Sequence, residues 1–209
     1  LHLYKIGAVM ANILLVVADA KHELPTSVAP NDNLNFLETG IGPQNTFEIL
    51  EAMLVTKHFT HIVCTGFCGS VRDDLPVGTI VIPTAIRTGN ESLMKQHAVI
   101  AVPARPRLIA NLEGCSVREG QIHSFSQIVT GRNVVNPDAI AVDMEMYSVA
   151  VLARQHEVSF IGGKVVSDIV PVTEVSPEQQ VAQIRQNMMT AKPFIYYFWS
   201  AAKQFIQDQ

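Results

Sequence analysis

Short apolar runs alternate along this chain with segments whose apolar residues recur at helical spacing. Continuous apolar runs are typical of strands that are covered on both faces of a sheet. The clearest run is Ile13–Ala18, which reads ILLVVA. The other segments in which we expect strands are Leu34–Glu38, His61–Thr65, Gly78–Pro83, Ala98–Val102, Val117–Phe125, Ala139–Val142 and Ser159–Val166.

Helical spacing is clearest between Gln44 and Lys57, where Phe47, Leu50 and Met53 predict an amphipathic helix. Further helices are expected over Pro103–Glu113, from Glu145 to about Gln155, and over Ser176–Gln207, where Pro193 would kink or break the helix. Because strands and helices alternate throughout, the expected fold class is α/β with a mixed, mainly parallel central sheet.

The length of 209 residues suits a single domain with a sizeable core, and we expect one domain over residues 1–209. Residues 1–9 carry no periodic pattern, and Met10 directly precedes the first clean apolar run. We therefore expect residues 1–9 to be an added or loosely held extension. An ordinary first strand through Ile6–Val9 is the alternative.

The composition of the chain indicates which classes of binding partner to expect. Only 16% of the residues are charged and 48% are hydrophobic, which favours a large buried sheet, an oligomer that hides surface, or both. The net charge of −4 offers no basic field to nucleic acid or to an anionic membrane. No apolar run approaches the roughly 20 residues of a membrane span. Three cysteines without a paired framework indicate a reducing compartment, so we expect a cytoplasmic protein. For the oligomeric state we expect a homodimer.

Acidic side chains follow several of the expected strands, at the edge of the sheet where ligands bind in α/β folds. Cleavage of a glycosidic bond needs an acid that protonates the leaving group and a base that activates water. Asp168 follows an apolar strand, where partial burial would raise its pKa and suit it to donate a proton. Glu23 lies in a polar stretch, where it could stay ionised and act as the base. Taken singly, each has an ordinary alternative, Asp168 as a cap and Glu23 as a solvated side chain.

Glu145 belongs to a third acidic segment, which begins at Asp143. At the start of a helix that follows a strand, the Glu145 carboxylate could accept both hydroxyls of a ribose. It could equally well stabilise its own helix through the helix dipole.

Two glycine loops, Gly40-Ile41-Gly42 and Gly66-Phe67-Cys68-Gly69, lie between strands and helices. They could bring backbone close to a ligand, or simply make tight turns. Neither fits the dinucleotide or the phosphate-loop fingerprint. The chain has no Gly-x-Ser-x-Gly elbow, and its scattered histidines argue against a metal site.

Taken together, these segments resemble the purine nucleoside phosphorylase and nucleosidase superfamily, most closely its methylthioadenosine/adenosylhomocysteine nucleosidases. The resemblance covers the chain from about Ile13 to the C-terminus and implies a three-layer αβα fold. The segments that carry it are Glu38-Thr39-Gly40-Ile41-Gly42, Ile62-Val63-Cys64-Thr65-Gly66-Phe67-Cys68-Gly69, Val142-Asp143-Met144-Glu145, where the superfamily usually has Val-Glu-Met-Glu, and Val165-Val166-Ser167-Asp168.

The resemblance implies a role for each matched residue. Asp168 matches the acid that protonates the purine at N7, and Glu23, five residues beyond Ala18, matches the base. Glu145 matches the ligand of the ribose hydroxyls, with Met144 packed against the sugar. The other positions expected at the substrate are Gly42, Cys68, Gly69, Ser167 and Val129, whose backbone would read the edge of the base.

Phosphorylases of this superfamily hold phosphate with arginines near the first strand and before the second glycine loop. Here these positions read Ala-Asp-Ala-Lys-His-Glu and Ile-Val-Cys-Thr, so the charge-assisted donors that phosphate needs are missing and water is the expected nucleophile. Lys21, His22 and Arg72 could substitute for the arginines, which keeps phosphorolysis as an alternative.

Departures from the family pattern concern the substrate. The span Asp19–Asn33 is shorter than the family's hairpin, Phe67 stands where nucleosidases often have Ser, and the base segment lacks its usual Asp-Ala-Phe. The expected function is hydrolysis of a purine nucleoside such as methylthioadenosine or adenosylhomocysteine, without metal or cofactor. A phosphorylase, a futalosine-type hydrolase and a non-catalytic nucleoside-binding protein remain as alternatives.

Overall fold

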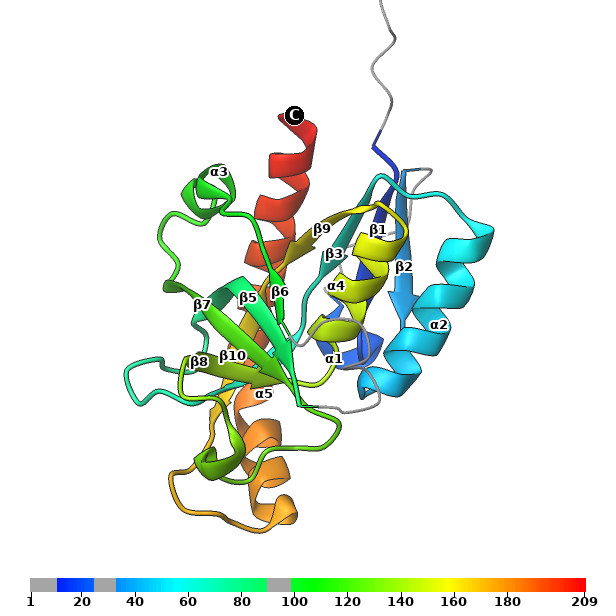
Figure 1. The fold of residues 1–209 in the computed structure, drawn as a ribbon. Helices are drawn as coiled ribbons and strands as arrows, with labels where there is room; N and C mark the ends of the chain where they lie inside the picture. The colour runs from blue at the N-terminus through cyan, green and yellow to red at the C-terminus, as the bar shows by residue number, and fades with distance from the viewer. Residues whose placement is uncertain (1–10, 25–32, 90–98) are drawn as a thin grey trace, which may run out of the picture.

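The computed structural model describes residues 11–24, 33–89 and 99–209, which form two β-sheets with helices packed around them (Figure 1). The first sheet is parallel, in the order β2 (Leu34–Glu38), β1 (Ile13–Val17), β3 (His61–Cys64) and β9 (Ser159–Gly162). The second sheet is mixed, in the order β10 (Lys164–Ile169), β4 (Phe67–Ser70), β8 (Ala139–Asp143), β7 (Val117–Ser124), β5 (Ile80–Thr88) and β6 (Val99–Ala101). The expected α/β class is confirmed, although the strands divide between two sheets. The extension expected over 1–9 and its alternative strand lie outside the described residues.

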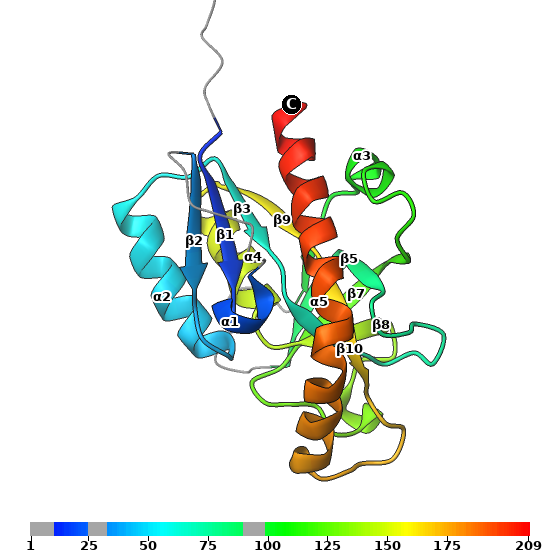
Figure 2. The ribbon, with the colours of Figure 1, turned by 180° about the vertical axis from the view of Figure 1, so that it is seen from behind.

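Helices cover both faces of the four-stranded sheet, which explains why its strand β1 is apolar throughout. Alternate residues of a strand point to opposite faces. Leu14 and Val16 pack in the cluster that includes α2 (Pro43–Thr56) and α4 (Met146–Gln155), whereas Ile13 and Leu15 pack in the cluster that includes α5 (Pro177–Gln207). Figure 2 shows α5 running along the back of both sheets.

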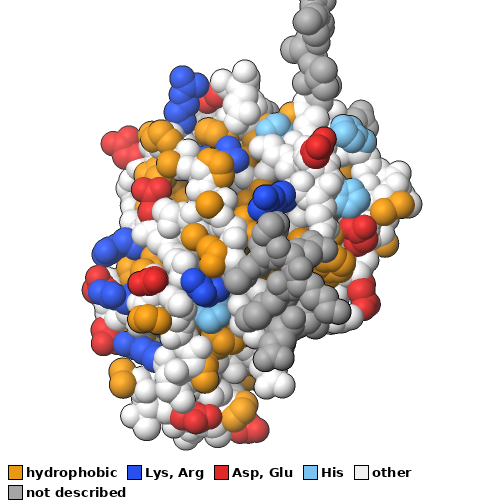
Figure 3. All heavy atoms as spheres, viewed as in Figure 1, with side chains coloured by type: hydrophobic (Ala, Val, Ile, Leu, Met, Phe, Trp, Pro, Cys, Tyr) orange, Lys and Arg blue, Asp and Glu red, His pale blue; other side chains and the backbone are white. Residues whose placement is uncertain are grey.

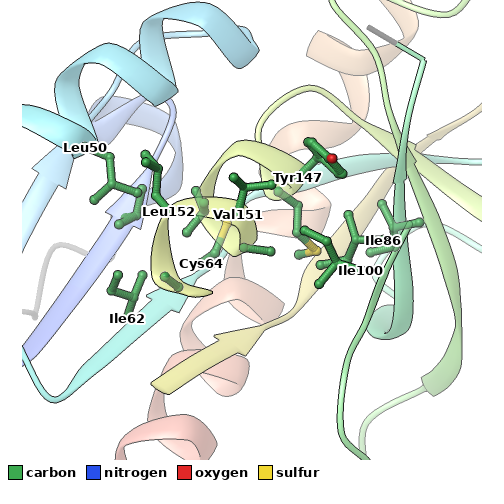
Figure 4. Close-up of a cluster of buried hydrophobic side chains, with 14 of the residues drawn as sticks. Leu50, Ile62, Cys64, Ile86, Ile100, Tyr147, Val151 and Leu152 are labelled. Atoms are coloured by element: carbon green, nitrogen blue, oxygen red, sulfur yellow. The ribbon is translucent and has the colours of Figure 1, made fainter. Parts of the chain in front are cut away.

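Helix α4 joins the two sheets through a shared core. Its residues from Met146 to Ala153 are all buried, so it is apolar on every side. Figure 4 shows Val151 and Leu152 of α4 among side chains from both sheets, with Ile62 of β3 on one side and Ile86 of β5 on the other.

The chain passes from the first sheet into the second at two glycines. Gly66 lies between β3 and β4, and Gly163 lies between β9 and β10. The prediction of one strand over Ser159–Val166 is therefore wrong. A side chain at Gly163 would collide with the ring of Phe198, so this position lets the backbone pass close to α5 and change sheets.

Several element boundaries differ from those predicted. A short helix, α1 (Ala20–Glu23), occupies the start of the polar stretch, because the Asp19 side chain accepts hydrogen bonds from the N–H groups of Lys21 and His22. The second glycine loop is itself strand β4. Helix α3 spans only Pro106–Ala110, and β5 continues past Pro83 to Thr88 with an irregularity at that proline.

Helix α5 continues through Pro193 without a break, so the expected interruption is not seen and at most a kink remains. Proline removes one backbone hydrogen bond, but Ala191, Ile195 and Phe198 are fully buried around it. Burial of this segment against both sheets offsets the loss. Along the described residues, no helix is long and apolar enough to cross a membrane.

Candidate active site

The glycine loops and acidic segments converge, as the rule for α/β folds predicts. The Glu23 carboxylate accepts the N–H of Phe67, and the Glu145 carboxylate accepts the N–H of Gly42. A Cβ placed on Gly69 would lie 3.0 Å from Oδ2 of Asp168. Strand β4 therefore runs from the Glu23 carboxylate at Phe67 to the Asp168 carboxylate at Gly69, two residues on.

Glu23 is buried at the end of α1, so the prediction of a solvated glutamate in a polar loop is wrong. Oε2 accepts the N–H groups of Ala18 and Asp19 at 2.7 and 3.2 Å, and Oε1 accepts that of Phe67 at 3.1 Å. Burial raises the pKa of Glu23, while the charge of Lys164 and the backbone donors act against this rise. Three backbone donors thus replace water around this carboxylate.

Gly66 leaves the space that Glu23 occupies. A Cβ at this position would meet all three atoms of the Glu23 carboxylate, and its φ of +128° lies in the region that favours glycine. The turn between β3 and β4 can accommodate the Glu23 carboxylate only because Gly66 has no side chain.

Glu145 precedes α4, but its side chain makes no capping hydrogen bond there. The N–H groups of Glu145 and Met146 bond instead to Oδ2 of Asp143, at 3.2 and 2.8 Å. Glu145 is buried and aims its carboxylate across the site, with Oε1 on Gly42 and Oε2 3.1 Å from Nζ of Lys164. The alternative drawn from the sequence, stabilisation of its own helix through the helix dipole, does not depend on a cap hydrogen bond and stays open.

Lys164 is the buried cation of this cluster, and the sequence analysis missed it. Its side chain is fully buried, with Nζ 3.1 Å from Glu145 and 3.4 Å from Asp143. Burial lowers the pKa of Lys164, but the charges of Glu145 and Asp143 outweigh burial and hold that pKa well above its ordinary value. A lone lysine in an apolar strand that leads to Ser167-Asp168 was the available signal, because such a charge is not buried without partners.

Asp168 is buried at the end of β10, as the sequence predicts. Oδ1 accepts the hydroxyl of Ser167 at 2.7 Å, and Oδ2 accepts Nε2 of Gln180 at 2.5 Å. Burial raises the pKa of Asp168, while these two donors act against the rise. The predicted direction of the shift therefore agrees with the structure, but Gln180 was not foreseen, since it lies on a helix twelve residues away.

The other residues expected at the substrate surround these carboxyl groups. Cys68 is buried and its carbonyl accepts the Ser167 hydroxyl at 3.3 Å, and burial holds the pKa of its thiol well above the ordinary value. Val129 packs with Val142, whose side chain lies beside Gly69. Met144 is half-buried between Asp143 and Glu145. Gly42 has a φ of +101° and turns its N–H to Glu145.

The three residues that could replace phosphate-binding arginines are engaged elsewhere or exposed. Nδ1 of His22 lies 2.6 Å from Oδ2 of Asp19, and Arg72 forms an exposed ion pair with Asp74 at 3.6 Å. Lys21 is exposed on α1. On the face drawn in Figure 3, acidic and basic side chains are interspersed and form no basic field. Among the described residues, no group of three or more His, Cys, Asp or Glu is arranged to hold a metal ion.

The known proteins that are similar to this chain include nucleosidases and a futalosine hydrolase. The 5'-methylthioadenosine/S-adenosylhomocysteine nucleosidase of Baumannia cicadellinicola subsp. Homalodisca coagulata is 24% identical over 154 residues, which cover 64% of this chain and 67% of that protein. The nucleosidase of the same name from Neisseria meningitidis, in complex with methylthio-immucillin-A, has a TM-score of 0.75 at 17% identity, over 94% of this chain and 99% of the other. Futalosine hydrolase of Helicobacter pylori has a TM-score of 0.71 at 17% identity, over 91% and 98%.

At such identities the solved structures show the fold alone. The sequence profile of the phosphorylase superfamily matches residues 30–195, most of the chain and nearly all of the site. The chain belongs to the phosphorylase superfamily.

Proposed function

We propose that this protein hydrolyses the N-glycosidic bond of purine nucleosides such as methylthioadenosine or adenosylhomocysteine. The observation that carries the proposal is the pair of buried carboxyl groups, Glu23 and Asp168, at the two ends of β4. The Glu23 carboxylate accepts the N–H of Phe67, and the Asp168 carboxylate lies beside Gly69, two residues along β4. A glycosidic bond held beside this strand would have one carboxyl group toward each end, as cleavage by an acid and a base requires.

Asp168 serves as the acid in this proposal. It protonates N7 of the purine, so that the base leaves as a neutral molecule. Burial raises the pKa of Asp168, which favours the protonated form that a general acid needs. The Ser167 hydroxyl holds Oδ1, and the other oxygen, Oδ2, accepts Nε2 of Gln180 and lies beside Gly69.

Glu23 serves as the base and Glu145 as the ligand of the sugar. Lys164 forms an ion pair with Glu145, and its charge acts against the rise in the pKa of Glu23, whereas the side-chain partners of Asp168, Ser167 and Gln180, are neutral. This difference separates the base from the acid. Glu145 has each oxygen held by one donor and keeps lone pairs for the two ribose hydroxyls, which fixes the sugar for attack by water on the anomeric carbon.

Water, rather than phosphate, fits the charge of this site. Lys164 is surrounded by the carboxylates of Glu23, Asp143 and Glu145, so the cluster carries more negative than positive charge. A phosphate dianion would be repelled here, because it needs several charge-assisted donors. Hydrolysis is therefore the first candidate reaction, and phosphorolysis is the second.

The relatives support a purine nucleoside with a modified 5' group. Two of them are named for methylthioadenosine and adenosylhomocysteine, and one for futalosine. Futalosine-type substrates are thus the alternative within hydrolysis, and a binding protein without turnover is the alternative outside it.

Release of free base from a nucleoside panel tests the proposal. The panel holds methylthioadenosine, adenosylhomocysteine, adenosine, inosine and futalosine, each with and without phosphate. We expect release without phosphate, and loss of turnover with largely retained binding in Asp168→Asn. Strict dependence on phosphate would establish a phosphorylase, and tight binding without product would establish a binding protein.

We also propose that the protein is a cytoplasmic homodimer. All three cysteines are free, which fits a reducing compartment. Exposed apolar side chains lie on and before α2, namely Ile41, Ile49 and Val55. Ile41 is next to Gly42, so a second copy placed here would shield the site from water.

A further inference from the structure

The first half of α5 is attached to the molecule through one buried side chain. Between Pro177 and Thr190, only Gln180 is buried, with 1% of its surface exposed. The next buried residue of the helix is Ala191. A capping box between Ser176 and Gln179 fixes where the helix begins. Gln180 therefore sits in the first turn of a well-defined helix, directly over the acid.

The Gln180 amide contacts the oxygen of Asp168 that lies beside Gly69. Nε2 donates to Oδ2 at 2.5 Å, and this same oxygen lies 3.0 Å from the Cβ position of Gly69. The other oxygen, Oδ1, is held by Ser167 within the strand. If the purine accepts its proton from Oδ2, the Gln180 amide contacts the oxygen that carries this proton.

We propose that Gln180 is a positioning residue for proton transfer, which holds the Asp168 carboxyl toward the purine and stabilises the carboxylate that forms there. The inference rests on the proposed function. As the O–H bond of Asp168 breaks and the N7–H bond forms, the electron pair stays on the carboxylate. The electrons of the glycosidic bond move into the purine, water adds to the sugar carbon, and the proton of that water passes to Glu23.

A neutral donor suits this task better than a cation would. A buried carboxylate is costly unless donors satisfy it, so an N–H bond to Oδ2 strengthens as charge develops. A cation at the same place would ionise Asp168 before the substrate arrived. Burial raises the pKa of Asp168, and the bonds from Ser167 and Gln180 limit the rise. Cys68 of β4 is a titratable group that interacts with Asp168, and burial holds the pKa of its thiol well above the ordinary value, so it stays neutral.

The test compares two leaving groups in Gln180→Leu, which removes the donor at similar size. A purine needs protonation to leave, whereas the nitrophenolate of a p-nitrophenyl riboside leaves as a stable anion. We expect kcat for methylthioadenosine to fall roughly 10- to 100-fold, with a change of less than about threefold for the nitrophenyl riboside. Gln183→Leu, at an exposed position one turn along α5, is the matched control and should match the wild type on both.

The pH profile is a second readout. Loss of the donor raises the pKa of Asp168 further, so the alkaline limb of kcat for the purine nucleoside should move to higher pH in Gln180→Leu. Equal loss on both substrates, or an unmoved limb, would show that Gln180 only anchors α5.

If circular dichroism shows that Gln180→Leu does not fold, Gln180→Asn keeps a shorter amide and should give a smaller loss, again confined to the purine. A wild-type protein that cleaves the nitrophenyl riboside but no purine nucleoside would overturn the proposed function and this inference together. Equal losses in an active enzyme overturn only the inference.

Discussion

At Asp168 and Glu23, burial and hydrogen bonding act on the pKa in opposite directions. Burial raises both pKa values, but Glu23 is opposed by three backbone donors and by Lys164, whereas Asp168 is opposed by one hydroxyl and one amide. The result is two carboxyl groups of similar burial with different electrostatic surroundings. This difference allows one fold to hold an acid and a base at the same pH.

Asp168 makes the folded protein less stable at neutral pH, since its pKa is raised by folding. Below its ordinary pKa of 3.8 it is protonated in both states and has no such effect. As the pH rises from there through the folded pKa, the unfolded chain ionises more readily and stability is lost. We therefore expect Asp168→Asn to melt a few degrees above the wild type at about pH 8 and to converge with it near about pH 4. Calorimetry at both pH values measures this, and a wild type that is more stable than the variant at about pH 8 would contradict it.

Lys164 holds the carboxylates of Asp143 and Glu145 together in the interior. Removing one partner of a buried ion pair leaves the other charges uncompensated, at about 3–5 kcal/mol. Lys164→Met should lower the free energy of unfolding by about that amount at neutral pH, and by less under acid that protonates the carboxylates. Urea titrations at two pH values measure the loss, with the exposed Lys57→Met as control. A pH-independent loss would indicate that the lysine contributes packing rather than charge.

The burial of Asp168 could be predicted from the sequence, because an apolar strand comes directly before it. The surroundings of Glu23 could not, since its donors come from the backbone of Ala18, Asp19 and Phe67, and Phe67 is 44 residues away. The burial of Gln180 could not be predicted from the sequence for a related reason. Its helix is polar around that position, and only the tertiary fold buries it.

At the scale of elements, apolar pattern predicted the long strands and helices but not where a strand changes sheet. Ser159–Val166 has one continuous pattern, yet the chain changes sheets at Gly163, where only the absence of a side chain makes room for the Phe198 ring of a distant helix. The short helix α1 was missed because four residues carry no period, and only the Asp19 cap marks it. Pro193 predicted a kink or break in the helix, but tertiary burial keeps α5 continuous there.

The cap of α5 offers a prediction at this scale. The Ser176 hydroxyl accepts the N–H of Gln179, and the Gln179 side chain accepts the N–H of Ser176. Ser176→Ala should lower the free energy of unfolding by about 1 kcal/mol. Thr190→Ala, at an exposed position inside the same helix, should be neutral or slightly stabilising. Denaturant titration of both variants measures the difference, and equal effects would show that the cap contributes nothing measurable.

For the whole molecule, the unusually small charged fraction of 16% could come from a large sheet or from a hidden interface. The structure accounts for part of it, since both faces of β1 and β3 are covered by helices. It also leaves apolar side chains exposed at Ile41, Ile49 and Val55, with 60%, 42% and 70% of their surfaces accessible. Ile49, Ala52 and Val55 recur every three residues on α2, so they lie along one side of the helix.

This side of α2 is where we expect the two copies of the proposed homodimer to meet. A charge placed in an apolar interface is desolvated without a partner, so Ile49→Asp should convert the dimer to a monomer in sedimentation velocity. Val172→Asp is the matched control, because Val172 is equally apolar and 70% exposed but lies in the loop after β10. If the interface shields the site, the monomeric Ile49→Asp should also release base more slowly, with the fold intact by circular dichroism. A wild type that sediments as a monomer at all concentrations would refute the dimer, and a dimeric Ile49→Asp would move the interface away from α2.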